Sequence, residues 1–172
     1  DLHSFPTRRS SDLNVINVVL DSVKLGGIVS KGSFTQIPRG WELETGETAV
    51  YTVYKNDEGL RLVCDRYDNP VLETLSTMLL IPQSLPEGAY LEEWHHLNVR
   101  SSVTDSTTGQ IVSDGSFDLP KTQKIYLKRY CPEWEIDIKY TFRLAVGMED
   151  SAEITTAVTD WTETKEIIIG DE

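Results

Sequence analysis

The sequence predicts an all-β protein that folds as an antiparallel β-sandwich of roughly seven to ten strands. Two features carry this prediction. Apolar residues recur with a period of two, whereas helical periodicity is hard to find anywhere in the chain. β-Branched and aromatic residues also dominate the apolar positions, as they do in strands. Because no helical segment separates the strand-like runs, an antiparallel sandwich is favoured over a βαβ fold.

Residues 14–67 contain four predicted strands. A strand over residues 14–24 should end at Gly26 and Gly27, and a second should run to Phe34 before the turn-rich sequence IPRGW. Strands over residues 50–54 and 60–67 flank the polar sequence KNDEG. This sequence has the turn chemistry of a hairpin loop, so the two strands should form a hairpin.

The middle of the chain contains a short strand and a long one. Residues 77–81 form a continuous apolar run that Pro82 closes, so we expect a strand that is buried on both faces. Residues 90–103 form a long extended segment, and an Asx/Gly-type turn follows at residues 105–109. Residues 126–130 then lead to Cys131-Pro132, where the chain must break.

The most regular alternation runs from Trp134 to Val146 and predicts one unbroken strand with one buried face. Burying each large side chain is worth about 1.5–3 kcal/mol, so a slip of one residue would be strongly unfavourable. After Gly147 the pattern returns at residues 154–158 and again at 167–169. The alternating apolar positions are Trp134, Ile136, Ile138, Tyr140, Phe142, Leu144 and Val146.

The length and charge of the chain limit the partners that it can have. Its 172 residues suffice for one domain with its own core. Its 28 acidic and 16 basic residues give a formal net charge of -12, which repels nucleic acid and anionic lipid, so we expect no nucleic-acid partner. The acidic residues are scattered, which favours a charged soluble surface over an acidic binding tail. No apolar stretch reaches the length of a transmembrane helix, and no secretory segment opens the chain.

The first residues, DLHSFPTRRSSDL, differ sharply in composition from the strand-like NVINVVL that follows. Residues 3–12 resemble the conceptual translation of a sequencing adapter, so we interpret residues 1–13 as a non-native or disordered segment. This interpretation places the natural N-terminal part, with any export signal, upstream of the sequence. The alternative is a disordered basic tail in which Arg8 and Arg9 form a cleavage or phosphate site. The folded domain should occupy residues 14–172.

Cysteine and histidine are too few and too badly spaced for a metal site. Cys64 and Cys131 lie far apart and in no CxxC pair, which argues against zinc and leaves their pairing open. His95 and His96 are adjacent, and adjacent side chains of a strand point to opposite faces, so they cannot bind one ion without a bulge. We interpret both as surface or cross-strand histidines and expect no metal and no other cofactor.

No catalytic residues are predicted, so we expect that the chain is not an enzyme. The serines lie in turn contexts, such as Ser101, Ser102 and Ser113, without a GxSxG elbow. Carboxylate pairs such as Glu92 and Glu93 could serve glycoside hydrolysis, but chance produces such pairs in so acidic a chain. The EF-hand pattern and the glycine-rich nucleotide-binding motifs do not occur.

The tryptophans leave a binding role open. Trp41, Trp94, Trp134 and Trp161 would make a sugar-stacking platform if they lay together on an exposed face. Trp134 belongs to the buried face of its predicted strand, and such residues are more often part of a core. A carbohydrate- or protein-binding module at the cell surface is therefore the alternative to a structural role.

Four segments in a fixed order carry a resemblance to a known family. They are GSFTQIPRGW, ending at Trp41, TMLLIPQSL, EWEIDIKYTFRLAVG, and ITTAVTDWTE, which contains Val158 and Trp161. Together they resemble the C-terminal part of the fimbrillin family, the two-domain pilins of type V pili in anaerobic Gram-negative bacteria. The family's patterns are a G-x-F/Y stretch before Trp, an apolar strand ending in Ile-Pro-Gln, W-x-x-G-x-x-Y-x-Y-x-L, and I-x-x-x-V-x-x-W.

The resemblance covers nearly all of residues 14–172, with two departures. The third segment lacks the glycine of its pattern, which suggests a longer unbroken strand here. The family pattern also does not call for the two cysteines.

The resemblance implies a transthyretin-like or immunoglobulin-like Greek-key sandwich with a structural role. The chain would be a subunit or surface-displayed component of a fimbria, contributing to adhesion, exported as a lipoprotein precursor and assembled at the outer membrane. Its partners would be other pilin subunits, joined by β-strand addition into a homo- or hetero-polymer, or a host glycan or protein. The N-terminal domain, the lipidated cysteine and the cleavage site would lie upstream.

Overall fold

The computed structural model describes residues 12–63, 71–105, 107–146 and 153–160, and these residues are almost entirely β-structure. They form ten strands and one short 3-10 turn, Leu127–Arg129, which confirms the predicted fold class. The strands are β1 (Asp12–Val29), β2 (Gly32–Gln36), β3 (Arg39–Leu43), β4 (Thr48–Leu62), β5 (Gln83–Ser84), β6 (Tyr90–Thr104), β7 (Ile111–Tyr126), β8 (Glu133–Trp134), β9 (Ile138–Ala145) and β10 (Glu153–Asp160).

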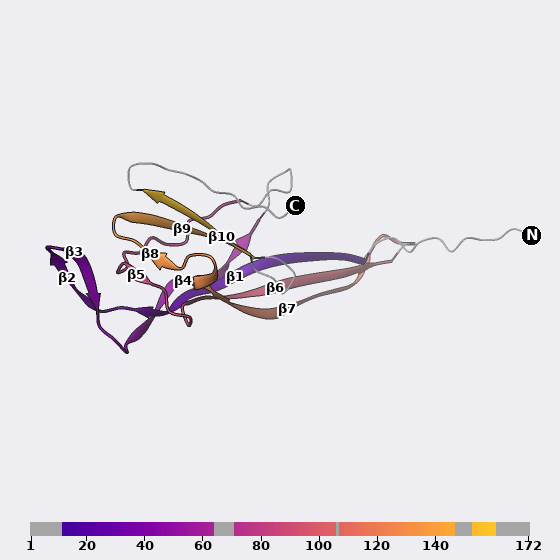
Figure 1. Cartoon of the computed structure of the whole chain (residues 1–172). Coiled ribbons are helices and arrows are strands. Elements are labelled where there is room, and N and C mark those ends of the chain that lie inside the picture. Colours follow the sequence, from indigo (N-terminus) through magenta and orange to yellow (C-terminus); the bar gives the residue numbers. More distant parts are fainter. Residues whose placement is uncertain (1–11, 64–70, 106, 147–152, 161–172) are drawn as a thin grey trace, which may run out of the picture.

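The largest sheet has the strand order β4-β1-β6-β7, and all its neighbours are antiparallel. Its two central strands, β1 and β6, pair from Asp12 opposite Val103 to Gly26 opposite Tyr90. Smaller two-stranded sheets are β9–β10, β5–β8 and the β2–β3 hairpin. In Figure 1 the long sheet runs the length of the body, and the hairpin projects at one end.

A second layer covers only part of this sheet, which gives a sandwich-like fold over one half of its length. Strands β5, β8, β9 and β10 lie over the half of the sheet that is nearer the hairpin (Figure 1). Tyr140, Phe142, Leu144 and Val146 pack against the core there. The buried core residues are Leu20, Val23, Leu25, Ile28, Leu85, Ala89, Leu91, Ile125, Leu127, Cys131 and Trp134.

The prediction that Gly26 and Gly27 end the first strand is wrong, because β1 continues through them to Val29. Gly27 has φ +71°, and a Cβ there would lie 2.1 Å from the carbonyl oxygen of Gly88. A Cβ on Gly26 would lie 2.4 Å from the Tyr90 ring. A side chain at either position would clash, and Gly27 also has a φ that favours glycine, so these residues permit close packing of β1 against the start of β6.

The predicted hairpin around KNDEG is wrong, because the chain does not turn back there. Both flanks belong to one strand, β4, and both pair with β1: Leu60 lies opposite Leu20 and Lys55 opposite Ser22. The polar residues between them form a bulge on β4, closed at Gly59, which has φ +72°. The local turn chemistry is therefore real, but the shared neighbour β1 decides that the strand continues.

Residues 77–81 are not a strand, and the prediction of a segment buried on both faces is wrong: Leu79 is 88% exposed. The chain is instead held by Gln83, just after Pro82. The Gln83 side chain accepts a hydrogen bond from the Val29 amide at 2.9 Å and donates to the Val29 carbonyl at 3.0 Å. A buried side chain thus does at the end of β1 what a neighbouring strand would otherwise do.

The segment from Trp134 to Val146 is two strands and not one. Asp137 has φ +63°, which breaks the run between β8 and β9 and corrects the expectation of an unbroken strand. The predicted alternation of faces holds on either side of this break. Trp134 is buried and Phe142 packs against the core, whereas Lys139 is exposed.

The remaining predictions have mixed outcomes. Strand β6, strand β10 and the turn after β6 are confirmed; Asp105 Oδ1 accepts hydrogen bonds from the amides of Thr107 and Thr108 at 2.7 and 3.0 Å. Nearly all of strand β7 is missing from the predicted strands, because Gly115 and Pro120 are poor strand formers. Pro120 is tolerated because β7 is an edge strand. Residues 167–169 lie outside the described part of the chain.

Replacing Gly27 with alanine tests the close approach. We expect Gly27→Ala to lower the free energy of unfolding, measured by urea denaturation, by at least about 2 kcal/mol, because the methyl group meets a backbone oxygen at a positive φ. The matched control is Gly115→Ala, since a Cβ at Gly115 meets no atom within 4 Å. Equal effects of the two substitutions would contradict this packing.

Candidate functional site: the uncovered arm of the sheet

Three strands of the long sheet extend beyond the end of β4. The last β1–β4 pair is Val18 opposite Leu62, whereas β1, β6 and β7 continue together past it. We call residues 12–17, 98–104 and 111–118 the arm. In Figure 1 the arm runs away from the body as three strands, with no described element over either of its faces. The arm is therefore sheet without a second layer in the described part of the chain.

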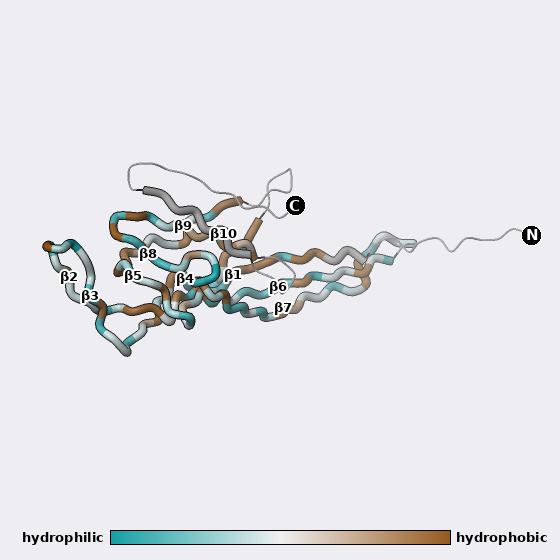
Figure 2. The backbone as a smooth tube through the Cα atoms, viewed as in Figure 1, coloured by the Kyte–Doolittle hydropathy of each residue, from teal (hydrophilic) through white to brown (hydrophobic). Residues whose placement is uncertain are grey.

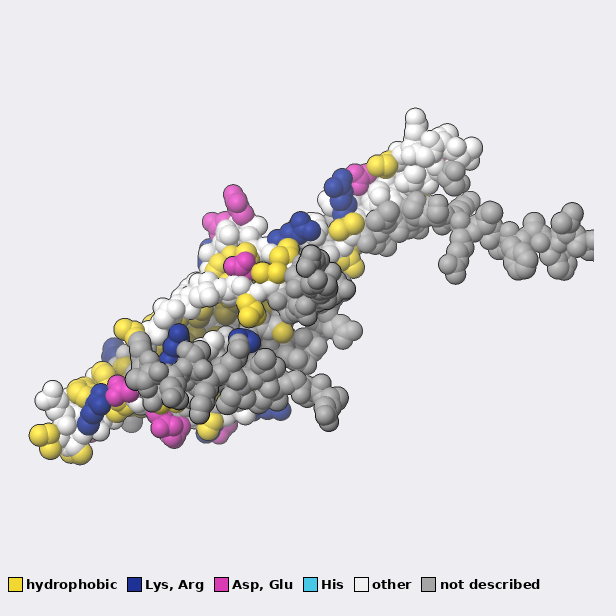
Figure 3. Space-filling view, turned by 90° about the horizontal axis from the view of Figure 1, so that it is seen from above, with side chains coloured by type: hydrophobic (Ala, Val, Ile, Leu, Met, Phe, Trp, Pro, Cys, Tyr) yellow, Lys and Arg dark blue, Asp and Glu magenta, His cyan; other side chains and the backbone are white. Residues whose placement is uncertain are grey.

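The apolar face of the covered half continues onto the arm. The register places Leu97 between Val18 and Leu119, and the next row on the same face is Val99. Figure 2 shows hydrophobic residues recurring along these strands, and Figure 3 shows hydrophobic side chains on the surface along the length of the molecule. We use the name arm face for two rows of this face: Ile16, Val99 and Phe117, which lie on the arm, and Val18, Leu97 and Leu119, which adjoin it in the covered half.

The arm face is only partly buried. Ile16 is 44% exposed and Phe117 is 52% exposed, whereas Leu97, next to the covered half, is 7% exposed. A row of large side chains on the core side of a sheet loses the benefit of burial when nothing covers it. Contiguous exposed apolar patches are typical of interaction surfaces, so the arm face is the candidate site.

The opposite face of the arm carries polar pairs that are exposed to solvent. Arg100 and Asp114 form an ion pair at 3.0 Å across β6 and β7, and Asn98 donates to Asp118 at 2.7 Å. The Arg100 guanidinium holds the pKa of Asp114 below its usual range, chiefly through this hydrogen bond. Exposed ion pairs of this kind contribute little to stability, but they keep a surface soluble. The two faces of the arm therefore differ in chemistry: cross-strand polar pairs lie on one face, and the apolar row of Ile16, Val99 and Phe117 lies on the other.

The arm also has an open edge. Beyond Val18 no described strand pairs with β1 on the side that β4 occupies in the covered half. Unpaired strand backbone is a ready template for another extended chain. The open edge and the arm face adjoin each other, so one incoming strand would reach both.

The two histidines lie on opposite faces of β6, as predicted, but only His96 is partly exposed. His96 Nδ1 lies 3.0 Å from Asp21 on β1, which confirms the cross-strand interpretation. His95 is 5% exposed, and the expectation that it lies at the surface or pairs across strands is wrong. Its partner is Glu93, two residues away on the same face, at 2.8 Å.

Glu93 and His95 are a polar pair inside the covered half. Glu93 is 1% exposed, and the register sets it beside Gln123 of β7 and sets His95 beside Lys121. Burial, the largest effect, raises the pKa of Glu93, while the hydrogen bond to His95 opposes this rise. Glu93 Oε1 and His95 Nε2 have no hydrogen-bond partner. Because two buried polar atoms of the pair lack partners, we expect the pair to lower the stability of the fold.

The other candidate residues do not converge on a reaction centre. Ser101 and Ser102 lie in β6 and Ser113 in β7, so their predicted turn contexts are wrong. Glu92 lies on the face opposite Glu93 and pairs with Lys124 at 3.5 Å. Within the described ranges, no group of three or more His, Cys, Asp or Glu side chains is placed to hold a metal ion.

The tryptophans are divided among elements. Trp134 is buried, as predicted, Trp94 is an exposed residue of β6, and Trp161 lies outside the described residues. Trp41 is 38% exposed on the β2–β3 hairpin, where its ring packs against Phe34 at 5.4 Å between centroids. An open hollow of about 450 Å³ lies between Trp41 and the β5–β8 pair.

Cys131 is a free and buried thiol, and burial raises its pKa. Its Sγ donates to the Glu133 carbonyl at 3.2 Å. Cys64 lies outside the described residues.

Among the described residues, no helix is long and apolar enough to span a membrane. No protein-family model, no curated protein and no solved structure matches this chain. The resemblance to fimbrillins therefore stays a prediction.

The buried pair makes a pH-dependent prediction. A carboxyl whose folded pKa is raised binds protons more tightly in the folded state, so stability falls as pH rises from below its unfolded pKa through its folded pKa. We expect Glu93→Gln to remove this fall in stability with rising pH. The free energy of unfolding at pH 7 should then rise by about 1.4 kcal/mol for each unit of pKa shift. The gain should shrink toward zero below the unfolded pKa.

Urea titrations between pH 4 and 8 would measure this difference, with Glu92→Gln on the opposite face as the control. A Glu93→Gln variant that is less stable than the parent chain at pH 7 would show that the charged pair stabilises the fold.

Proposed function

We propose that the chain is a structural, non-catalytic subunit of a fimbria or pilus at the cell surface and outer membrane, which joins other subunits by β-strand addition and contributes to adhesion. The observation that carries this proposal is the arm, where an apolar sheet face and an open strand edge lie side by side. Main-chain hydrogen bonds to the edge of β1 would supply the link, and alternate side chains of the incoming strand would cover Ile16 and its neighbours.

The geometry of the family landmarks supports the proposal. Counted from Trp134, the family pattern W-x-x-G-x-x-Y places its glycine at position 137, and Asp137 has φ +63° there. This left-handed conformation is the one that favours glycine, and aspartate is among the few other residues that adopt it readily. The glutamine of Ile-Pro-Gln is Gln83, whose side chain holds the end of β1. The local structure thus gives a physical reason for the residue type at two landmarks, position 137 and Gln83.

A carbohydrate- or protein-binding module at the cell surface is the second candidate. Its support is the hollow between the hairpin and the β5–β8 pair, where exposed Trp41 lies near Glu133 and Glu135. Figure 3 shows hydrophobic side chains at the tip of the hairpin, where Ile37 is 90% exposed. However, Trp134, the other tryptophan of this hollow, is buried. A solvent-facing tryptophan pair, which would favour glycan binding, is therefore not formed there.

Neighbouring residues of β1 provide the test of the arm as an assembly surface. Ile16 and Val15 are 44% and 43% exposed, but they point to opposite faces, and only Ile16 belongs to the arm face. We expect the full chain to associate with its own copies in sedimentation-velocity runs at increasing concentration. Ile16→Lys should weaken this association at least tenfold by placing a charge under the incoming strand, whereas Val15→Lys should leave it unchanged.

Thermal unfolding of both variants would check that each keeps the parent fold. Association that both variants weaken equally would contradict assembly through the arm face. A parent chain that stays monomeric throughout its soluble range would contradict assembly from copies of this chain.

A further inference from the structure

A small hollow lies at the other end of β7, away from the arm. It has a volume of about 150 Å³ and forms where β7 passes into the turn Leu127–Arg129. Three backbone hydrogen bonds of 2.9 Å fix the turn: the Leu127 amide donates to the Ala89 carbonyl, and the Tyr130 and Cys131 amides donate to the Leu127 carbonyl. The hollow is lined by Gln123, Lys124, Ile125, Tyr126, Arg129 and Tyr130.

The charge of this hollow is opposite to that of the chain. Its charged lining residues are Lys124 and Arg129, in a protein of formal net charge -12. Lys124 is held in place, 4.1 Å from the centre of the Tyr90 ring and 3.5 Å from Glu92. Arg129 is exposed and has no ion-pair partner among the described residues. The neighbouring Lys128 is already paired with Glu87 at 2.6 Å. Within the described part of the chain, the Arg129 guanidinium is therefore available to receive an anion.

Aromatic rings border this cation. Tyr126 and Tyr130 both line the hollow and are 49% and 43% exposed, so each is partly open to solvent. A tyrosine ring offers an apolar surface against which a sugar ring can pack, and its hydroxyl can bond to a neighbouring hydroxyl. The planar fork of arginine matches a carboxylate, which it binds through two parallel hydrogen bonds. The combination fits a ligand that carries one carboxylate on a compact ring.

We propose that the hollow at Arg129 binds the carboxylate of an acidic sugar, such as a uronic acid, with Lys124 assisting and with Tyr126 and Tyr130 against the ring. Its volume suits one sugar ring and is below that of sites for drug-sized ligands. A single carboxylate also meets less repulsion from the acidic chain than a polyanion would. This site does not include any part of the arm, so its test is independent of the test of assembly by strand addition.

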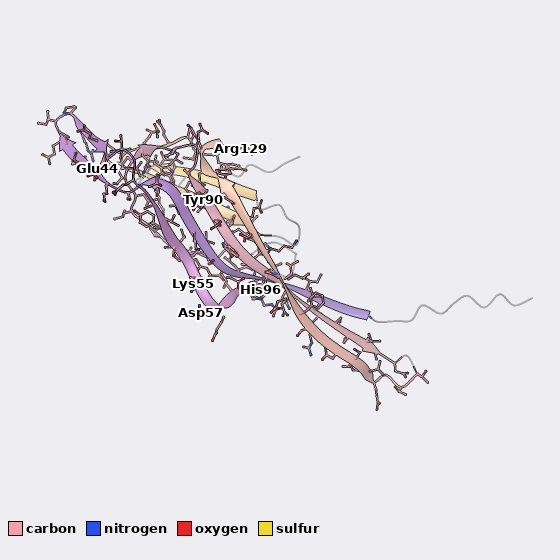
Figure 4. All side chains as sticks on the ribbon, turned by 90° about the horizontal axis from the view of Figure 1, so that it is seen from below. Glu44, Lys55, Asp57, Tyr90, His96 and Arg129 are labelled. Atoms are coloured by element: carbon pink, nitrogen blue, oxygen red, sulfur yellow. The ribbon has the colours of Figure 1, made fainter. Side chains whose placement is uncertain are left out.

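Titration of the full chain with sodium glucuronate, followed by amide and arginine side-chain NMR signals, tests the proposal. We expect saturable shifts confined to the hollow, weakening in high salt, and no comparable shifts with glucose. Arg129→Gln should lower the affinity at least tenfold, and Arg129→Lys should recover only part of it because the fork is lost. The matched control is Lys55→Gln, which removes the same charge at an exposed position away from Arg129 and Tyr90 (Figure 4).

Three outcomes would overturn the proposal. The first is an absence of saturable shifts with glucuronate, and the second is equal loss of affinity in Arg129→Gln and Lys55→Gln. The third is tighter binding of a short acetylated glutamate-rich peptide than of glucuronate at the same residues, which would make the hollow a contact for acidic protein segments.

Discussion

The pairing of β1 with β6 is the interaction on which the rest of the structure depends. It runs from Asp12 opposite Val103 to Gly26 opposite Tyr90, with one irregularity between Leu20 and Ser22. The neighbours of these strands, β4 and β7, are positioned by them, and the core grows on one side of them. Since alternate residues of a strand face alternate sides, one continuous ladder also imposes one continuous apolar face, whether or not anything covers it.

The two halves of that ladder have different sources of stability. In the covered half, Leu20, Leu25 and Leu91 are buried, and each contributes about 1.5–3 kcal/mol by burial. This margin tolerates the unfavourable burial of Glu93 beside His95. In the arm, Ile16 and Phe117 remain near half exposed. Hydrogen bonds between the strands, at about 0.5–1.5 kcal/mol each, therefore supply a larger share of the stability there. A partner strand would supply the burial that the arm lacks.

The alternation in the sequence was sufficient to predict the fold class, strand β6 and the buried face of residues 134–146. It could not predict where backbone geometry or a distant neighbour decides the outcome. Gly27 looks like a strand end but serves a close approach to Gly88, and KNDEG looks like a hairpin but is a bulge because β1 pairs with both flanks. His95 looks like a surface residue because a buried ionisable pair is rare. The arm was not foreseen, since a periodic pattern shows which face is apolar but not what covers it.

Amide hydrogen exchange along β6 of the isolated chain tests most directly whether one ladder has a covered and an uncovered half. The structure predicts that residues 91–97 exchange only through global unfolding and that residues 98–104 exchange faster through local opening of the arm. Equal protection along the whole of β6 would mean that the arm is as stable as the core. In that case its apolar face would need no partner, and the basis for assembly by strand addition would be lost.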